Sequence, residues 1–246
     1  MIKLHPLPGL PEVAPGDDLA ELLHSAAVDA EVPLDRGALV VCQKVVSKAE
    51  GRLTALADVT PRPLAVEIAE EFEKDPRHVE VVLSETRRVV RRAHGVLICE
   101  TRHGFVCANA GVDLSNAPGP DVAVLLPEDP DASARGLREA LRARGAGDIA
   151  VVVSDTFGRP WREGLVDVAI GSAGVAPLDD VRGQSDLSGR ELVVTTMATP
   201  DQFAAAAGLL MLKDSGVAAV WISGITPEGD GQLADLVRDP ANDLFR

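Results

Sequence analysis

The sequence predicts a mixed α/β fold in a single domain that covers residues 1–246. Three observations lead to this expectation. Short apolar, β-branched runs recur along the chain, amphipathic helical patterns separate them, and no internal repeat or low-complexity linker divides the sequence. A hydrophobic fraction of 46% can supply a sizeable core, so we treat the chain as one functional unit that can contain sub-lobes.

The elements of the first half follow from the spacing of apolar residues. Leucine, valine or alanine recurs every three or four residues in the helical segments, and β-branched residues cluster in the strand segments. In chain order we expect a helix over Asp18–Ala27, a strand over Ala38–Cys42, helices over Leu64–Lys74 and His78–Arg92, and strands over Val96–Cys99 and Val122–Leu126. The basic run Arg87–Arg92 then lies on a helix as a solvated face, and His103 lies at a hairpin turn.

The second half shows the same alternation. We expect a helix over Ala132–Arg144, strands over Ile149–Val153 and Leu192–Thr196, a helix over Pro200–Lys213 and a strand over Val217–Ile222. The residues Thr199-Pro-Asp-Gln202 have the spacing of a capping box with proline at the first helical position. The last helix is therefore expected to begin there.

Composition argues against several classes of function. The net charge of -14, from 24 basic and 38 acidic residues, disfavours nucleic acid as a partner, because binding to a phosphate backbone depends on clustered cations. The same charge means that a phosphorylated ligand must meet a local cationic or metal site. No long apolar run predicts a membrane span, and three cysteines lack the spacing of a zinc site or a disulfide framework. We expect a cytoplasmic protein with reduced thiols and no membrane partner.

Two polar segments that follow apolar runs are the main candidates for a site. They are Cys107–Asn116 and Ser154–Gly164, and their pattern places Asp113 and Asp155 at strand ends. Carboxylates on tight loops after buried strands, next to hydroxyls and amides, suit a hard divalent cation. The alternative is that these residues only form turns.

Phosphate binding has no common motif in this chain. A P-loop and a Gly-x-Gly-x-x-Gly turn after a strand are both absent, which disfavours the P-loop and Rossmann folds. Two other segments can cradle a nucleotide: the rigid turn Leu7–Pro11, and Gln43–Arg52 directly after the strand at 38–42. Lysine ammonium groups and a hydroxyl can bind phosphate oxygens there. The alternative is an exposed basic strand or loop.

Five ordered motifs, spread over nearly the whole chain, resemble the coenzyme F420-0:gamma-glutamyl ligase family. The matching pieces are Gly9-Leu-Pro11, Val45-Val-Ser47-Lys48-Ala-Glu-Gly51-Arg52, Ala110-Gly-Val-Asp113-x-Ser-Asn116, Asp155-Thr-x-Gly-Arg-x-x-Arg162-x-Gly164 and Gly189-Arg-Glu-Leu192. The resemblance implies a homodimer with a mixed-sheet α/β fold of its own. It also implies GTP as phosphoryl donor, Mg²⁺ or Mn²⁺, often K⁺, and addition of L-glutamate to a deazaflavin phospholactate, coenzyme F420-0. Some members are fused to a nitroreductase-like domain, so the chain is either a standalone enzyme or the ligase domain of such a fusion.

Residue by residue, the resemblance implies Asp113, Asp155 and Thr156 as metal ligands. The catalytic set is then Asp113, Asp155, Arg159 and Arg162, the two arginines holding nucleotide phosphates or the acceptor's phosphodiester. The implied nucleotide contacts are Pro8, Gly9, Leu10, Pro11, Gln43, Ser47, Lys48, Asn116 and Lys213.

Amide formation from a carboxylate and an amine requires activation of the carboxylate, so the leading hypothesis is an acyl phosphate made from GTP. Two other hypotheses use the same aspartates. One is a metal-dependent phosphoesterase that activates water, and the other is a GTP-binding protein without turnover. Acceptor-dependent GTP consumption separates the first hypothesis from both.

Overall fold

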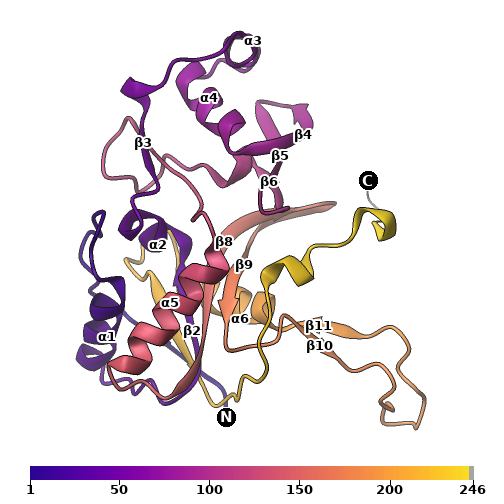
Figure 1. Cartoon of the computed structure of the whole chain (residues 1–246). Helices are drawn as coiled ribbons and strands as arrows, with labels where there is room; N and C mark the ends of the chain where they lie inside the picture. The colour runs from indigo at the N-terminus through magenta and orange to yellow at the C-terminus, as the bar shows by residue number, and fades with distance from the viewer. Residues whose placement is uncertain (244–246) are drawn as a thin grey trace.

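A five-stranded mixed sheet forms the centre of the larger lobe in the computed structural model, which describes residues 1–243 (Figure 1). Its strand order is β1 (Lys3–Pro6), β12 (Ala219–Ser223), β2 (Arg36–Cys42), β8 (Asp148–Arg159) and β9 (Arg162–Ala173). The neighbours β2 and β8 run parallel, and the other neighbours in this sheet run antiparallel. The prediction of a mixed-sheet α/β fold is confirmed.

Helices cover both faces of this sheet. Along β2, Leu39 and Val41 pack toward one face and Ala38 and Val40 toward the other, because successive strand residues point to opposite sides. The first face is covered by α1 (Leu19–Asp29), α2 (Gln43–Ala49) and α5 (Pro130–Ala143), and the second by α6 (Thr199–Gly208). Burial on both faces explains why the central strands are continuously apolar in sequence.

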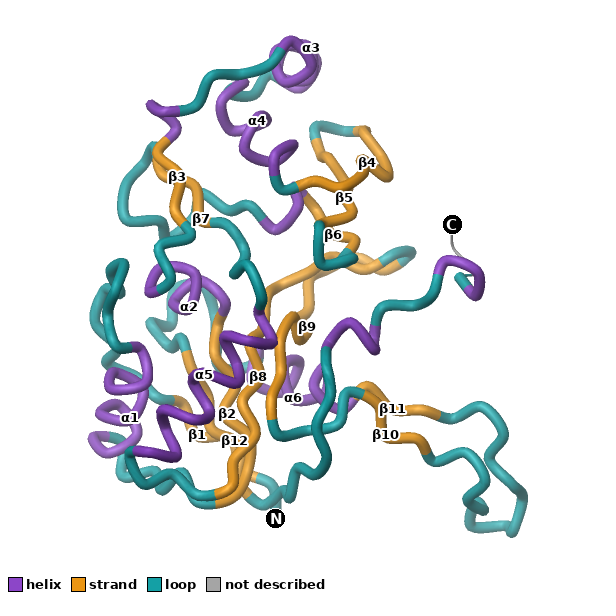
Figure 2. Tube along the Cα trace, viewed as in Figure 1, coloured by secondary structure: helices purple, strands orange, loops and turns teal. Residues whose placement is uncertain are grey.

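A smaller lobe, residues 53–125, is inserted between α2 and α5 and is called the insert lobe below (Figure 2). It has its own apolar core, which includes Ile68, Val82 and Cys99. The chain enters it on β3 and leaves it on β7, and these two strands pair antiparallel with Leu53 opposite Val124. Its elements are β3 (Leu53–Ala55), η1 (Leu56–Asp58), α3 (Pro63–Phe72), α4 (Pro76–Ser84), β4 (Thr86–Ala93), β5 (Val96–Thr101), β6 (Val106–Ala108), η2 (Asn109–Gly111) and β7 (Val122–Val124).

A long hairpin, residues 178–198, extends away from the larger lobe and is called the projecting arm (Figure 1). Its base is the strand pair β10 (Leu178–Asp180) and β11 (Thr196–Ala198), and scattered backbone hydrogen bonds with one isolated bridge, Ser185 to Glu191, join its two sides farther out. Large apolar side chains at Leu187, Val193 and Val194 are exposed on it. The short helices η3 (Leu233–Leu236) and η4 (Pro240–Asn242) follow β12. Within residues 1–243, no helix combines the length and the hydrophobicity needed to cross a membrane.

Most predicted elements are confirmed with shifted ends, and the helix expected over His78–Arg92 is the largest error. The helix α4 ends at Ser84, and residues 86–93 form strand β4. The Thr86 hydroxyl donates to the Val82 carbonyl, and Arg87 and Arg88 then pair across the sheet with the buried Glu100 on β5. The basic run is therefore a strand, and at 87 and 88 its charges are paired.

Two expectations near the last helix are also wrong. Residues 192–195 are not strand: the continuous ladder of the projecting arm begins at Thr196, and residues 192–195 make only isolated backbone hydrogen bonds, with Val193 and Val194 exposed. No capping box forms at Thr199, because α6 already begins at that residue and no side chain caps it. The helix ends at Gly208, five residues before the predicted end at Lys213.

Candidate active site

A cleft of about 230 Å³, called the carboxylate cleft, lies where the insert lobe meets strand β8. The insert lobe contributes Asp113, and β8 contributes Asp155 and Thr156. Two lysines complete the charged lining, Lys44 from α2 and Lys213 from the loop after α6. Four residues predicted from sequence, Asp113, Asp155, Thr156 and Lys213, thus share one cavity.

Asp155 is not at a strand end, as the sequence suggested, but inside β8 opposite Val168 on β9. The pairing of these two strands continues to Arg159 and Arg162, beyond the buried part of the sheet. Its register shifts between Val153 and Ser154, and such a bulge re-aims the side chains that follow. The bulge replaces the loop that the sequence predicted.

The half-buried Asp155 carboxyl lies in surroundings that disfavour its ionised form. Desolvation, together with the charges of Asp113 and Asp167, raises its pKa to about 6, and Lys44 and the Thr156 backbone N–H only partly oppose this. A cation beside Asp155 is therefore stabilised by this cleft.

Asp113 has the opposite electrostatic behaviour. Desolvation acts to raise its pKa, but hydrogen bonds from Lys44 and Ser115 outweigh it, so the pKa lies below its usual value. The Lys44 Nζ lies 2.8 Å from Asp113 Oδ2, and the Ser115 N–H donates to Asp113 Oδ1 at 2.7 Å. Backbone hydrogen bonds with Val124 fix the residue on both sides. Asp113 is ionised and held in place.

The two aspartates should respond oppositely to Asp→Asn in thermal denaturation of metal-free protein. A folded pKa above the unfolded value makes the ionised Asp155 unfavourable, a penalty that grows as pH rises through about 6, so Asp155→Asn should raise Tm at pH 8. Asp113→Asn leaves Lys44 without its carboxylate and should lower Tm, each kcal/mol shifting Tm by about 2–4 °C.

The Tm gain of Asp155→Asn should shrink at pH 5, where the wild-type carboxyl is mostly protonated. Differential scanning fluorimetry with a chelator present measures both variants. Equal destabilisation of both at pH 8 would contradict this account of the cleft.

The predicted nucleotide contacts gather along α2, beside the cleft. The turn Pro8–Pro11 follows β1, with Gly9 in the left-handed region at φ 85°, and Glu12 just after it pairs with Lys48. Ser47 donates to Gln43 Oε1 at 2.8 Å, and both side chains are fully buried. Gln43 Nε2 has no partner among the described residues, so a buried donor remains for a ligand oxygen.

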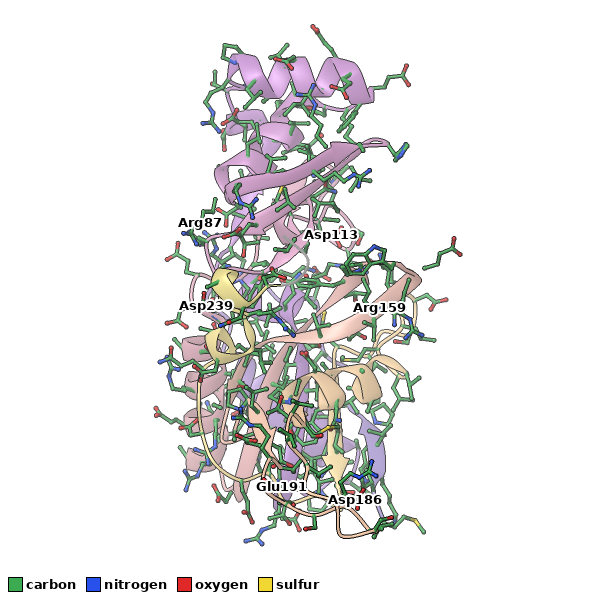
Figure 3. All side chains as sticks on the ribbon, turned by 90° about the vertical axis from the view of Figure 1, so that its right-hand side faces the viewer. Arg87, Asp113, Arg159, Asp186, Glu191 and Asp239 are labelled. Carbon is green, nitrogen blue, oxygen red and sulfur yellow. The ribbon has the colours of Figure 1, made fainter. Side chains whose placement is uncertain are left out.

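Three other predicted residues do not line the carboxylate cleft. Arg159 and Arg162 face each other at the tip of the β8–β9 hairpin, and Figure 3 shows Arg159 near the level of Asp113 but farther out. One Arg159 amino group donates to the Glu163 carbonyl, which holds it on the tip. Asn116 is exposed in the left-handed conformation just after Ser115. The structure therefore brings neither arginine into the carboxylate cleft.

Sequence reasoning missed Lys44 and Asp167. Lys44 lies within a segment singled out for phosphate binding, but that segment was expected to be a strand or loop. It is instead the helix α2, and Lys44, its second residue, reaches Asp113. Asp167 accepts a hydrogen bond from the Thr156 hydroxyl at 2.6 Å from the neighbouring strand β9. Only the strand register shows that Asp167 belongs to the site.

The donor set fits a small, hard divalent cation. Across the described residues, no three histidine, cysteine, aspartate or glutamate side chains come together to form a metal cage. Two carboxylates and a hydroxyl match Mg²⁺ or Mn²⁺, which are commonly bound by one or two carboxylates with water and substrate phosphates completing the shell. Cys107 also lines the cleft, but burial raises its thiol pKa to about 12, so it is not a thiolate ligand or nucleophile.

Comparison with known proteins gives a consistent result over the whole chain. Residues 9–224 match the family model described as F420-0:Gamma-glutamyl ligase. The chain is 47% identical to the coenzyme F420:L-glutamate ligase of Methanopyrus kandleri, and the match covers 100% of this chain and 98% of that protein. It is 45% identical to the protein of the same name from Methanothermobacter thermautotrophicus, over 100% and 99% of the two chains. The corresponding protein of Archaeoglobus fulgidus is 39% identical, over 100% of this chain and 96% of that protein.

Proposed function

Because the chain belongs to the F420-0:gamma-glutamyl ligase family, we propose that it is a GTP- and divalent-metal-dependent ligase that adds L-glutamate to coenzyme F420-0. Further glutamates are then joined through γ-carboxyls. The observation that carries the proposal is one cleft in which Asp113, Asp155 and Thr156 lie among two lysines. Oxygen ligands for a cation and ammonium groups for phosphate are what phosphoryl transfer from a nucleotide requires.

Each part of the site has a task in this reaction. Asp113, Asp155 and Thr156 hold the cation, which neutralises phosphate charge when bound. Lys44 and Lys213 supply positive charge to the γ-phosphate, and the unpaired Gln43 Nε2 donates to the nucleotide near the Pro8–Pro11 turn. Phe157 and Leu165 form an apolar wall that limits access of water to the reacting groups.

The chemistry consists of two balanced transfers. The acceptor carboxylate attacks the γ-phosphorus of GTP, the bond to the β-phosphate oxygen breaks, and GDP and an acyl phosphate result. The neutral amine of glutamate then attacks the acyl carbon, inorganic phosphate leaves and the amide forms. The charged side chains of the site are held in place before the reaction, so they can stabilise the charge that develops on the reacting groups and lower both barriers.

The projecting arm supports the proposal of a homodimer. Its exposed Leu187, Val193 and Val194 form apolar surface that a second copy of the chain would cover. All three cysteines are free thiols, which supports a reducing cytoplasmic location. A K⁺ requirement is a further part of the proposal and rests on the family membership.

The proposal is tested by incubating the protein with coenzyme F420-0, GTP, Mn²⁺, KCl and glutamate and measuring the products by mass. A ladder of products with successive added glutamates, and GDP release that depends on both acceptor and glutamate, is expected. GDP release without acceptor would instead indicate a phosphoesterase, and tight GTP binding without any turnover would indicate a sensor.

Lys48→Ala is expected to weaken Mn²⁺–GTP binding by about 10- to 100-fold, the loss expected for a charge-assisted hydrogen bond. Two variants serve as controls. Glu12→Ala removes the same ion pair but keeps Lys48, and Arg87→Ala removes a cation that pairs with Glu100 on another sheet. Both should retain GTP affinity in isothermal titration calorimetry. Equal losses in Lys48→Ala and Arg87→Ala would mean that Lys48 makes no specific contact with the nucleotide.

A further inference from the structure

A second cleft of about 290 Å³, called the aromatic cleft, lies on the other side of Phe157. Phe157 lines both this cavity and the carboxylate cleft, so the two cavities adjoin the same side chain. The remaining walls come from the β5–β6 turn, strand β9, the start of α6 and the segment 233–238. None of the residues predicted as metal or nucleotide contacts lines it.

The wall of the aromatic cleft is unusual for this chain. The sequence has five phenylalanines and no tyrosine, yet Phe105 and Phe157 both face this cavity. Their ring centroids lie 6.4 Å apart in an edge-to-face arrangement, and His103 stacks on Phe105 at 5.6 Å. His103 is itself fixed by the Pro127 and Glu128 carbonyls. These mutually packed rings form a rigid, preformed wall on which an aromatic ligand can pack.

The cleft is mainly apolar and carries two charged groups, Asp201 and Arg238. Asp201 Oδ1 accepts the Ala169 N–H at 2.9 Å, while no partner is seen for Oδ2 within residues 1–243. The opposite rim is formed by Val237, which lies so close to the turn that a Cβ at Gly104 would meet it at 3.3 Å. An apolar cavity with one acceptor and one donor is the usual form of a small-molecule site.

We propose that the aromatic cleft binds the deazaflavin ring of the acceptor, while the acceptor's carboxylate reaches past Phe157 into the carboxylate cleft. This inference rests on the proposed function. A deazaflavin is a planar three-ring system whose pyrimidinedione edge carries an N–H donor flanked by carbonyl acceptors. One of the two inclined rings, Phe105 or Phe157, can stack on its face while the other contacts its apolar edge, and Asp201 and Arg238 match the donor and acceptors of its pyrimidinedione edge.

The test separates the ring site from the phosphate chemistry. Leu236→Trp fills the aromatic cleft and Phe105→Ala removes part of its wall, whereas Leu64→Trp adds the same bulk on exposed helix α3 of the insert lobe. Steady-state kinetics give KM for coenzyme F420-0 and kcat, and calorimetry gives the Kd of Mn²⁺–GTP. Fluorescence titration with the deazaflavin ring and ribityl chain, lacking phospholactate, probes the cleft alone.

Both cleft variants should raise KM for the acceptor and the Kd of the ring fragment by about tenfold or more. Their Kd for Mn²⁺–GTP should equal that of wild type, and Leu64→Trp should change none of these values. Wild-type KM in both cleft variants, or equal loss of GTP binding, would overturn the inference while leaving the ligase proposal standing. A wild-type protein that makes no glutamylated product would overturn the ligase proposal itself, and this inference with it.

Discussion

Asp155→Asn and Asp113→Asn are each expected to lower the rate of ligation by at least about 10²- to 10³-fold, the loss typical when a group that stabilises transition-state charge is removed. Asparagine keeps the shape and the hydrogen-bonding capacity of aspartate but removes its charge. A residue that only forms a turn tolerates the change, whereas a cation ligand does not. Product formation followed by mass, after circular dichroism has confirmed the fold, measures the effect.

The double variant Asp113→Asn/Asp155→Asn should be scarcely worse than either single variant, because residues that act as one unit are strongly non-additive. Asp148→Asn is the matched control, since Asp148 begins the same strand and only pairs with Arg138. It should keep full activity. Near-normal turnover in either single cleft variant would place the metal elsewhere.

Lys44→Met is expected to lower kcat/KM by about 10²-fold or more, since the ammonium group pairs with Asp113 and its charge also acts on Asp155. The change should also shift the pH profile. Lys44 lowers the pKa of Asp155, so its removal raises that pKa further, and protons then compete more strongly with the divalent cation for this carboxylate, which moves the acidic limb of the profile to higher pH.

Initial rates measured between about pH 5.5 and 8.5, at a fixed Mn²⁺ concentration below saturation, give both kcat/KM and the position of the acidic limb. Lys44→Arg should restore part of the rate and return the acidic limb toward wild type, because it keeps the charge with a different geometry. An unchanged pH profile in Lys44→Met would show that the contact with Asp113 serves only to hold the loop.

The fold class and the location of the site were predictable from particular patterns. The valine-rich strand at 149–153 and the strand at 38–42 are apolar on both faces, which fixed the centre of the sheet. Asp113, Asp155 and Thr156 were predicted together as metal ligands and Lys213 as a nucleotide contact, and all four line one cleft. The ordered motifs made the first grouping possible, since each motif alone is compatible with a simple turn.

What could not be predicted depends on pairing between distant segments. The apolar spacing that begins at His78 predicted a helix through the run at 87–92, but this run pairs with β5 as a strand, with ion pairs from Arg87 and Arg88 to Glu100. Lys44 reaches the cleft from the first turn of α2, and the register of β8 with β9 brings Asp167 against the Thr156 hydroxyl beside the cleft. Periodicity carries no information on such register, and so these two residues remained hidden.

The two carboxylates come together in one cleft only when the two lobes of the chain dock correctly. Asp113 belongs to the insert lobe and Asp155 to the larger lobe, and each lobe has a core of its own. A chain that completes both cores but docks them incorrectly would retain nearly all of its secondary structure and still lack a working centre. Specific activity is therefore a stricter gauge of native assembly than any spectroscopic measure of helix or strand content.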